Sequence, residues 1–228
     1  MKILRYFTTF EKLLWLFSAG MILASFFVFD RTNYLSLLAS FVGITFLVLN
    51  AKGNPLCQFL TIVFSILYGM ISYSYMYYGE MITYLGMTAP MALVALISWL
   101  KHPYKGKRAQ VEVNALSKAE IYFALLFTIV VTIVFYFILR FFGTAHLIPS
   151  TLSVTTSFLA VYLTFRRSPY FALAYAANDL VLVCLWAMAS ADEKRYVSVL
   201  VCFIVFLFND LYGFFNWKRM QRIQNNAG

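Results

Sequence analysis

Residues 196–217 read YVSVLVCFIVFLFNDLYGFFNW and are followed at once by KRMQR. The stretch is 22 residues long, which is enough for a helix to cross a hydrocarbon core about 30 Å thick. Its second half nevertheless carries Asn209, Asp210, Tyr212 and Asn216. An ionised carboxylate that faces lipid costs about 2.5–3.5 kcal/mol. We therefore predict a membrane-spanning helix whose polar side chains face protein, water or a ligand.

These polar residues fall on two neighbouring stripes of the predicted helix. Asn209, Tyr212 and Asn216 follow one another at helical spacing, and Asp210 begins a second stripe with Gly213. A spanning helix with a polar face predicts an internal cavity.

The composition places the whole chain in the membrane. Apolar residues make up 62 % of the sequence, charged residues make up 12 %, and the mean hydropathy is +0.78. These values are typical of a polytopic membrane protein and exclude a soluble domain. The formal charge of +9 comes from basic residues in short loops between apolar runs, so we expect no nucleic-acid partner.

Eight apolar runs predict an all-α protein with eight transmembrane helices. Of the 18 Lys and Arg residues, all but Arg31, Arg140, Lys194 and Arg195 fall on one side if the spans alternate. The excess of positive charge on that side predicts that both termini are cytoplasmic. The runs cover residues 13–29, 34–49, 56–78, 81–100, 119–142, 150–165, 170–190 and 196–217.

An internal repeat divides these helices. LSLLASFVG, from Leu35, matches LSVTTSFLA, from Leu152, and each unit ends in a Trp beside basic residues, Trp99 and Trp217. One helix lies between the units, so both units point the same way, as in parallel transporter repeats that hold substrate near the midplane. The prediction is a 3+1+3 core with four parts: an N-terminal cytoplasmic segment and extra helix (1–33), a first three-helix repeat (34–101), a cytoplasmic loop and linker helix (102–149), and a second three-helix repeat with a basic tail (150–228).

Other helices carry further candidates for a binding site. Asn178 and Asp179 lie near the centre of the run 170–190, and Trp186 follows two turns later. Tyr68 belongs to a polar stripe, and Thr88 precedes Pro90, which predicts a kinked helix. Each of these groups could instead hold neighbouring helices together through hydrogen bonds.

Some acidic and aromatic residues are not expected to take part in a binding site. Glu80 lies at an outer turn and is expected to be solvated. Tyr77, Trp99 and Trp217 lie near helix ends and are expected in the interfacial belts. The sequence shows no nucleotide-binding loop and no membrane-hydrolase motif, so we expect neither an enzyme nor a pump fuelled by ATP, and no metal or cofactor.

The segments NDLVLVCLW, from Asn178, and CFIVFLFNDLYGFFNWKRM, from Cys202, resemble the PnuC-type nicotinamide riboside transporters. The resemblance extends over most of the chain. It implies a fold similar to the SWEET sugar transporters, assembled as a homotrimer in the bacterial inner membrane. It also implies uptake of nicotinamide riboside by facilitated diffusion, with accumulation driven by cytosolic phosphorylation.

Carried onto this chain, the resemblance implies roles for several of the candidates. Trp186 would stack on the ring, Asn178 and Asn209 would hold it, and ribose hydroxyls would reach Thr88, Tyr68 or Tyr212. Asp179 or Asp210 would place a negative charge near the cationic pyridinium. The segment 170–190 has one Trp where family members can have more, and relatives carry thiamine or riboflavin.

Two other classes of function stay open at this point. In a proton-coupled transporter, Asp179 or Asp210 would take up a proton in each cycle. In a membrane-embedded enzyme or assembly protein, the polar residues would be purely structural, although the paired polar stripes and the repeat argue against this.

Overall fold

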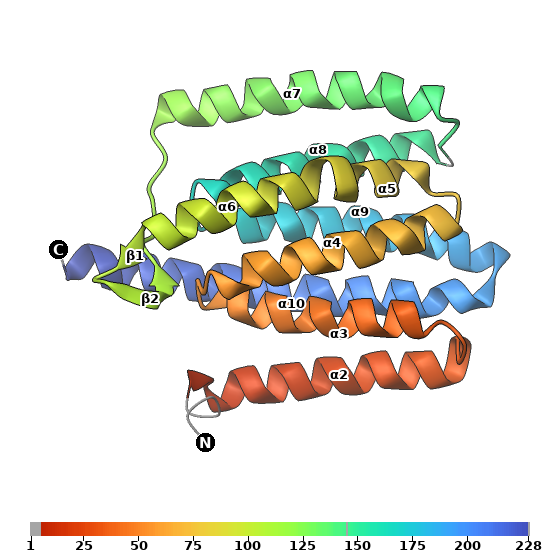
Figure 1. The fold of residues 1–228 in the computed structure, drawn as a ribbon, viewed down its shortest axis with the longest axis horizontal. Coiled ribbons are helices and arrows are strands. Elements are labelled where there is room, and N and C mark those ends of the chain that lie inside the picture. Colours follow the sequence, from red (N-terminus) through yellow and green to blue (C-terminus); the bar gives the residue numbers. More distant parts are fainter. Residues whose placement is uncertain (1–5, 145, 228) are drawn as a thin grey trace.

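Eight helices that are long and apolar enough to span a membrane make up most of residues 6–144 and 146–227, the part described by the computed structural model (Figure 1). The prediction of an all-α protein with eight spans is therefore confirmed. Residues 1–5, with Lys2 and Arg5 of the predicted cytoplasmic segment, lie outside the described residues. The helices are α2 (Thr9–Phe29), α3 (Tyr34–Ala51), α4 (Leu56–Ser74), α5 (Tyr78–Thr83) continued by η1 (Tyr84–Thr88) and α6 (Ala89–Lys101), α7 (Lys118–Phe141), α8 (Leu147–Phe165), α9 (Phe171–Asp192) and α10 (Val197–Asn226).

The outer two helices flank a six-helix core. α2 packs on α3 and α10, whereas α7 packs on α8, and Figure 1 shows them on opposite sides of the bundle. Their outward faces carry large exposed apolar side chains, such as Phe17 on α2 and Phe137 on α7. These faces suit contact with lipid tails.

The contacts within the core come in corresponding pairs. α3 packs on α4 as α8 packs on α9, and α4 packs on α6 as α9 packs on α10. The third helix of each unit also crosses to the first helix of the other unit, because α10 packs on α3 and α6 packs on α8. A 3+1+3 repeat requires corresponding contacts of this kind in its two units. The repeat itself stays a prediction.

The first helix of each unit ends in the same way. After α3, the amide of Gly53 donates to Asn50 O at 2.9 Å; after α8, the amide of Arg167 donates to Thr164 O at 2.9 Å. Gly53 (φ 65°) and Arg167 (φ 57°) both adopt the left-handed conformation that commonly terminates helices. Arg167 takes it without the freedom of a glycine.

Two tryptophans join the units at these helix ends. Trp217 Nε1 donates to Asn50 O at 2.7 Å, and Trp99 Nε1 donates to Thr164 O at 2.8 Å. Both side chains are 0 % exposed, and their rings lie 5.4 Å apart. The expectation of interfacial positions for Trp99 and Trp217 is therefore wrong, because each indole N–H finds its partner inside the protein.

The segment between the units forms a short hairpin that the sequence did not predict. Strand β1 (Pro103–Tyr104) pairs with β2 (Lys107–Val111). The segment then bonds to both left-handed turns: the amide of Val111 donates to Gly53 O at 2.9 Å and the amide of Asn114 donates to Arg167 O at 3.0 Å. We call residues 107–114 the strap.

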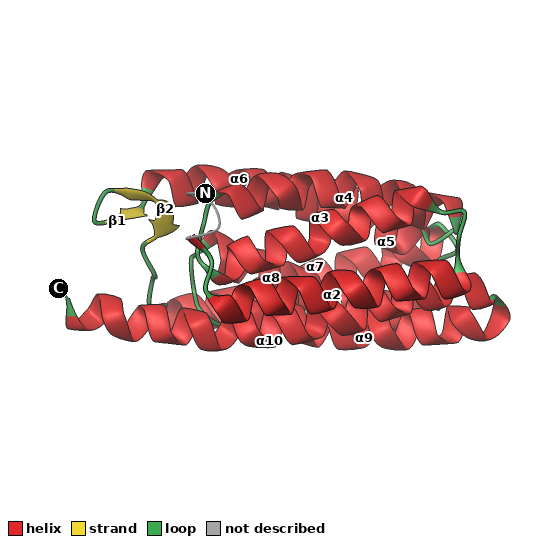
Figure 2. Ribbon diagram, turned by 90° about the horizontal axis from the view of Figure 1, so that it is seen from below, coloured by secondary structure: helices red, strands yellow, loops and turns green. Residues whose placement is uncertain are grey.

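The strap also holds the end of α10. Gln224 accepts a hydrogen bond from the amide of Val113 at 2.7 Å and donates one to Val111 O at 3.2 Å. The predicted basic tail is therefore helical as far as Asn226. Figure 2 shows the hairpin and the C-terminal part of α10 together beyond one end of the bundle.

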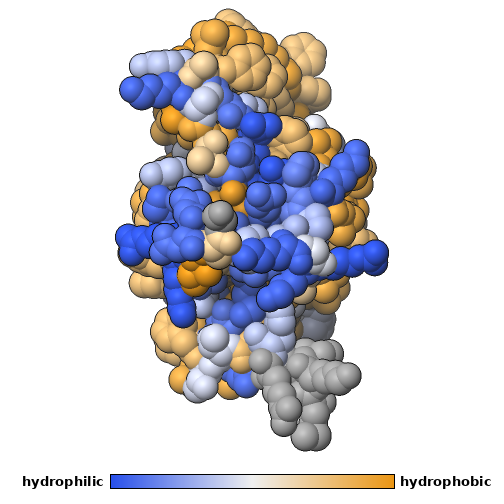
Figure 3. All heavy atoms as spheres, turned by 90° about the vertical axis from the view of Figure 1, so that its left-hand side faces the viewer, coloured by the Kyte–Doolittle hydropathy of each residue, from blue (hydrophilic) through white to orange (hydrophobic). Residues whose placement is uncertain are grey.

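This end of the bundle, which we call the terminal end, has a hydrophilic surface. Figure 3 views it directly and shows hydrophilic side chains gathered across it, with apolar side chains around the rim. The α3–α4 and α8–α9 loops lie here, and they contain Lys52, Arg166 and Arg167.

We expect the terminal end to face the cytoplasm, because it carries most of the basic residues. A single cysteine introduced at Ala109 in the strap should stay unlabelled by a membrane-impermeant maleimide in intact cells. A cysteine at Lys194, at the other end, should be labelled. Both should react after the membrane is permeabilised, and the reverse pattern would invert the topology.

We expect Trp99→Phe and Trp217→Phe to destabilise the protein by similar amounts. Each change removes an indole N–H that serves a buried carbonyl, together with part of a packed side chain, at a cost of about 1–3 kcal/mol. The measurement is the melting temperature of the detergent-purified protein. Phe215→Leu, at a side chain that is 69 % exposed, is the control, and Trp variants as stable as the wild type would contradict the assigned role.

Candidate functional site

A small cavity of about 30 Å³ lies inside the core, with walls from both units. Its polar lining is Asn50, Gln58, Thr61, Thr88, Tyr175, Asn178, Asp179 and Asp210, and its apolar lining is Phe46, Leu47, Phe64, Tyr84, Phe203 and Phe206. A cavity of this size holds about one or two water molecules. We call it the central cavity.

Two carboxyl groups lie together in the lining of the central cavity. Asp179 of α9 and Asp210 of α10 are each 4 % exposed and lie close enough to interact directly. Asp179 Oδ2 has no hydrogen-bond partner among the described residues. The lining contains no Lys, Arg or His. The arrangement is therefore suited to a cation or a neutral hydrogen-bonding group, and it disfavours an anion.

Asn178 is held by hydroxyl groups of α8. Its Oδ1 accepts hydrogen bonds from Ser153 at 3.3 Å, Thr156 at 2.9 Å and Ser157 at 3.0 Å. The 3.6-residue periodicity of α8 places these three hydroxyls on one face. Asn178 therefore enters the cavity with a fixed orientation.

Aromatic rings fill most of the space between the units. A Cβ on Gly43 would lie 2.0 Å from the ring of Phe206, so only glycine allows this ring to pack against α3. Phe206 also contacts Phe64, with ring centres 5.6 Å apart, and Phe64 stacks on Tyr68 at 5.6 Å. The central cavity is small because these rings occupy its surroundings.

A π-helical turn shapes the wall contributed by the fourth span. In η1 the amide of Ala89 donates to Tyr84 O, five residues earlier. The predicted kink at Pro90 stays a prediction, and the irregularity that the structure shows is a widened turn on the N-terminal side of the proline. π-turns of this kind are frequent at functional sites, and here both Tyr84 and Thr88 line the central cavity.

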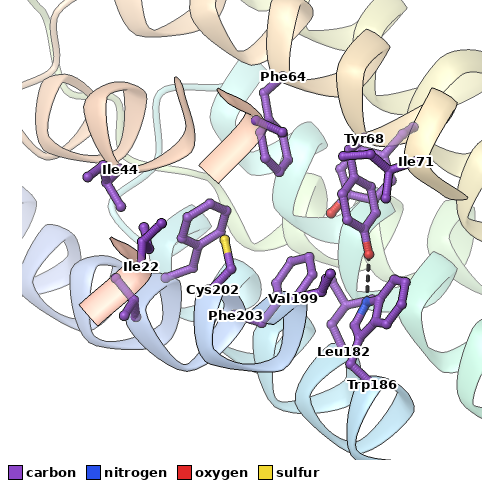
Figure 4. Close-up of a cluster of buried hydrophobic side chains, with 14 of the residues drawn as sticks. Ile22, Ile44, Phe64, Tyr68, Ile71, Leu182, Trp186, Val199, Cys202 and Phe203 are labelled. Carbon is purple, nitrogen blue, oxygen red and sulfur yellow. Dashed lines mark hydrogen bonds between the residues drawn. The ribbon is translucent and has the colours of Figure 1, made fainter. Parts of the chain in front are cut away.

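Trp186 lies outside the central cavity, in a cluster of tyrosines. Its Nε1 donates to Tyr68 Oη at 2.7 Å (Figure 4), and its side chain is 0 % exposed. The rings of Tyr75, Tyr77 and Tyr196 surround it with centres 5.0–5.9 Å away. Burial raises the pKa of Tyr77, in the α4–α5 loop, to about 12, so its hydroxyl keeps its proton. Tyr77 is itself buried and does not belong to an interfacial belt.

Three of the predicted site residues, all on α10, lie outside the central cavity and bond to α2 and α3. Asn209 Nδ2 donates to Ser18 Oγ at 3.1 Å, Tyr212 Oη donates to Glu11 Oε1 at 3.1 Å, and Asn216 donates to the carbonyl oxygen of Ala51 at 2.7 Å. These three residues share one stripe, as predicted. The stripe faces α2 and the end of α3, and each of its three residues donates a hydrogen bond there, whereas Asn209 Oδ1 has no partner among the described residues.

The other six predicted residues divide between two places. Asn178, Asp179, Asp210 and Thr88 line the central cavity. Tyr68 and Trp186 lie in the aromatic cluster beside it. Sequence reasoning missed Asn50, Thr61, Tyr84 and Tyr175 as lining residues. Thr61 stands one helical turn after Gln58 and two turns before Tyr68. It could therefore have been found on the polar stripe to which Tyr68 belongs.

Glu80 is buried, which corrects the expectation that it is solvated. Its side chain is 1 % exposed and Oε2 lies 3.3 Å from Ser153 Oγ. The α5 helix starts at Tyr78, three residues before the predicted start at residue 81, and it packs on α8. The position therefore faces the interior.

Comparison with known proteins gives consistent matches. Residues 33–219 match the family model described as nicotinamide mononucleotide transporter. The nicotinamide riboside transporter PnuC of Neisseria mucosa is 28 % identical over 218 residues, covering 93 % of this chain and 82 % of the relative. A crystal structure of the vitamin B3 transporter PnuC is similar with a TM-score of 0.84 and 25 % identity, covering 96 % of this chain and 94 % of that chain.

We expect Gly43→Ala to destabilise the protein, because the new methyl group collides with the ring of Phe206. Overpacking of this kind costs about 1–3 kcal/mol, and it should lower the melting temperature. Gly20→Ala is the matched control, since nothing lies within 4 Å of a Cβ at Gly20 and alanine favours a helix. A Gly43→Ala protein as stable as the control would contradict the described packing.

Proposed function

Because the chain belongs to the nicotinamide mononucleotide transporter family, we propose that this multi-pass membrane transporter carries nicotinamide riboside into the cell. The family description names the mononucleotide, whereas the curated relative is a transporter of the riboside. The two compounds differ by a phosphate group. The central cavity contains two carboxyl groups and no cationic side chain, which favours the riboside.

The observation that carries the proposal is the pair Asp179 and Asp210 in a cavity lined by no cationic side chain. A phosphate group in this place would face two carboxyl groups with no Lys or Arg to neutralise it. The riboside carries a cationic pyridinium ring and neutral hydroxyls. Its charge is complementary to the pair, and its ring suits the surrounding aromatic side chains.

We assign substrate contact first to the residues that line the central cavity: Asn178, Asp179, Asp210 and Thr88. Tyr68 and Trp186 complete the site when the aromatic cluster opens, with the Trp186 ring available for stacking. Asn209, Tyr212 and Asn216 serve the packing of α2 and α3 against α10.

Transport requires the aromatic packing to change. A ligand pocket usually has a volume of about 300–1,000 Å³, and the central cavity has about 30 Å³. We therefore infer that the central cavity must widen before it can hold the substrate. The corresponding contacts of the two units support movement of one unit against the other, with the site opening to each side in turn.

The remaining features of the proposal follow from the resemblance. Uptake is downhill, and cytosolic phosphorylation of the riboside drives accumulation. The protein works as a homotrimer in the bacterial inner membrane, with both termini in the cytoplasm. The gathering of hydrophilic side chains at the terminal end supports this orientation.

A proton-coupled transporter is the second candidate, favoured by the same two carboxyl groups. Buried carboxyls inside membrane helices are typical of proton relays. Riboside uptake into proteoliposomes that contain no kinase distinguishes the two mechanisms. Uptake that equilibrates and is indifferent to a protonophore supports facilitated diffusion, and uptake that collapses supports coupling.

The proposal is tested by calorimetric titration of the detergent-purified protein with nicotinamide riboside, nicotinamide mononucleotide, thiamine and riboflavin. We expect the riboside to bind and the mononucleotide to bind at least about tenfold more weakly, a difference of about 1.4 kcal/mol. Asp210→Asn and Trp186→Ala should each weaken riboside binding by a similar factor.

Asp192→Asn, at an exposed carboxyl at the end of α9, is the control and should bind normally. Equal or tighter binding of the mononucleotide would contradict the charge argument. Binding of thiamine or riboflavin in place of the riboside would agree with a transporter but contradict the proposed substrate.

A further inference from the structure

Glu80 is a buried acid that the proposed transport site does not use. Its Oε1 has no hydrogen-bond partner among the described residues, and its Oε2 contacts Ser153 Oγ alone. The titratable groups around it are the phenols of Tyr68, Tyr77 and Tyr84. The facing helix α8 contains no Asp, Glu, Lys, Arg or His. An ionised Glu80 would thus be a buried charge with no counter-charge.

The hydrogen bonds around Ser153 depend on whether Glu80 carries a proton. Ser153 Oγ lies 3.3 Å from Glu80 Oε2 and 3.3 Å from Asn178 Oδ1. A serine hydroxyl has one hydrogen to donate, so it cannot serve an ionised carboxylate and an amide oxygen together. A protonated Glu80 removes the conflict: Glu80 donates to Ser153, and Ser153 donates to Asn178.

This chain of hydrogen bonds fixes the direction of the Asn178 amide. With its oxygen turned toward Ser153, Thr156 and Ser157 of α8, its NH₂ group is left for the central cavity, which Asn178 lines. An ionised Glu80 would draw the hydrogen of Ser153 to itself. Ser153 would then present a lone pair to Asn178, which favours the reversed amide, with oxygen toward the cavity.

We propose that Glu80 is a protonated positioning residue, which acts through Ser153 to present Asn178 to the substrate as a hydrogen-bond donor. Glu80 has no substrate contact in this role. The inference rests on the proposed function only where Asn178 meets the substrate, since the proton on Glu80 can be observed in the protein alone.

The first experiment detects the proton without any ligand. Infrared spectra of the purified protein at pH 7 are compared for wild type, Glu80→Gln and the control Glu112→Gln, whose carboxyl is exposed. We expect the carbonyl stretch of one protonated carboxylic acid to disappear in Glu80→Gln and to remain in the control. Identical spectra in this region for all three proteins would overturn the proposal.

The second experiment measures riboside affinity by calorimetry at pH 6. Glu80→Gln keeps a donor for Ser153 and should bind within about threefold of the wild type. Ser153→Ala and Glu80→Ala break the chain and should bind about tenfold more weakly, as expected for the loss of one oriented hydrogen bond.

Each outcome of the second experiment decides the proposal. Normal binding by Ser153→Ala, or equal weakening by Glu80→Gln and Ser153→Ala, would overturn it. If Glu80→Ala fails to fold, Glu80→Gln and Ser153→Ala still decide. If the wild type binds no riboside at all, the proposed function is wrong, and the infrared comparison alone decides the role of Glu80.

Discussion

The structure depends on the rule that main-chain polar groups inside a membrane must find their hydrogen-bond partners within the protein. The two tryptophans at the terminal end show how the chain meets this rule. Each indole N–H reaches a carbonyl at the end of a helix that belongs to the other unit, Asn50 O for Trp217 and Thr164 O for Trp99. The carbonyl groups at the ends of α3 and α8 thus each gain a hydrogen-bond donor. The same two bonds hold the units in a fixed relative position.

The eight spans and the cavity were predictable from sequence, because hydropathy and helical spacing report directly on burial. Asp179, Asp210 and Asn178 were predicted as lining residues for the same reason. A polar side chain in the middle of an apolar run is costly in lipid and therefore faces the interior. The positions of Asn209, Tyr212 and Asn216 were not predictable. Their stripe is polar whether it faces a cavity or α2, and only the packing of the added helix decides between the two.

Whether a side chain near a helix end is buried was the hardest feature to predict from the sequence. Glu80, Trp99 and Trp217 all lie within a turn or two of a predicted boundary, where a side chain can face solvent, lipid headgroups or the interior. The fourth span begins three residues earlier than predicted, at Tyr78. Glu80 is therefore buried, although it was expected at the surface. The strap was missed because its hydrogen bonds join segments that are distant in sequence, such as Gly53 and Val111.

The strap makes the two ends of the bundle unequal. It bonds to the left-handed turn of each unit, through Gly53 O and Arg167 O, so separating the units at the terminal end breaks main-chain hydrogen bonds worth about 0.5–1.5 kcal/mol each. At the other end, the connection between α7 and α8 makes no corresponding bridge among the described residues. The linker therefore holds the two units together at the terminal end through hydrogen bonds as well as through the continuity of the chain.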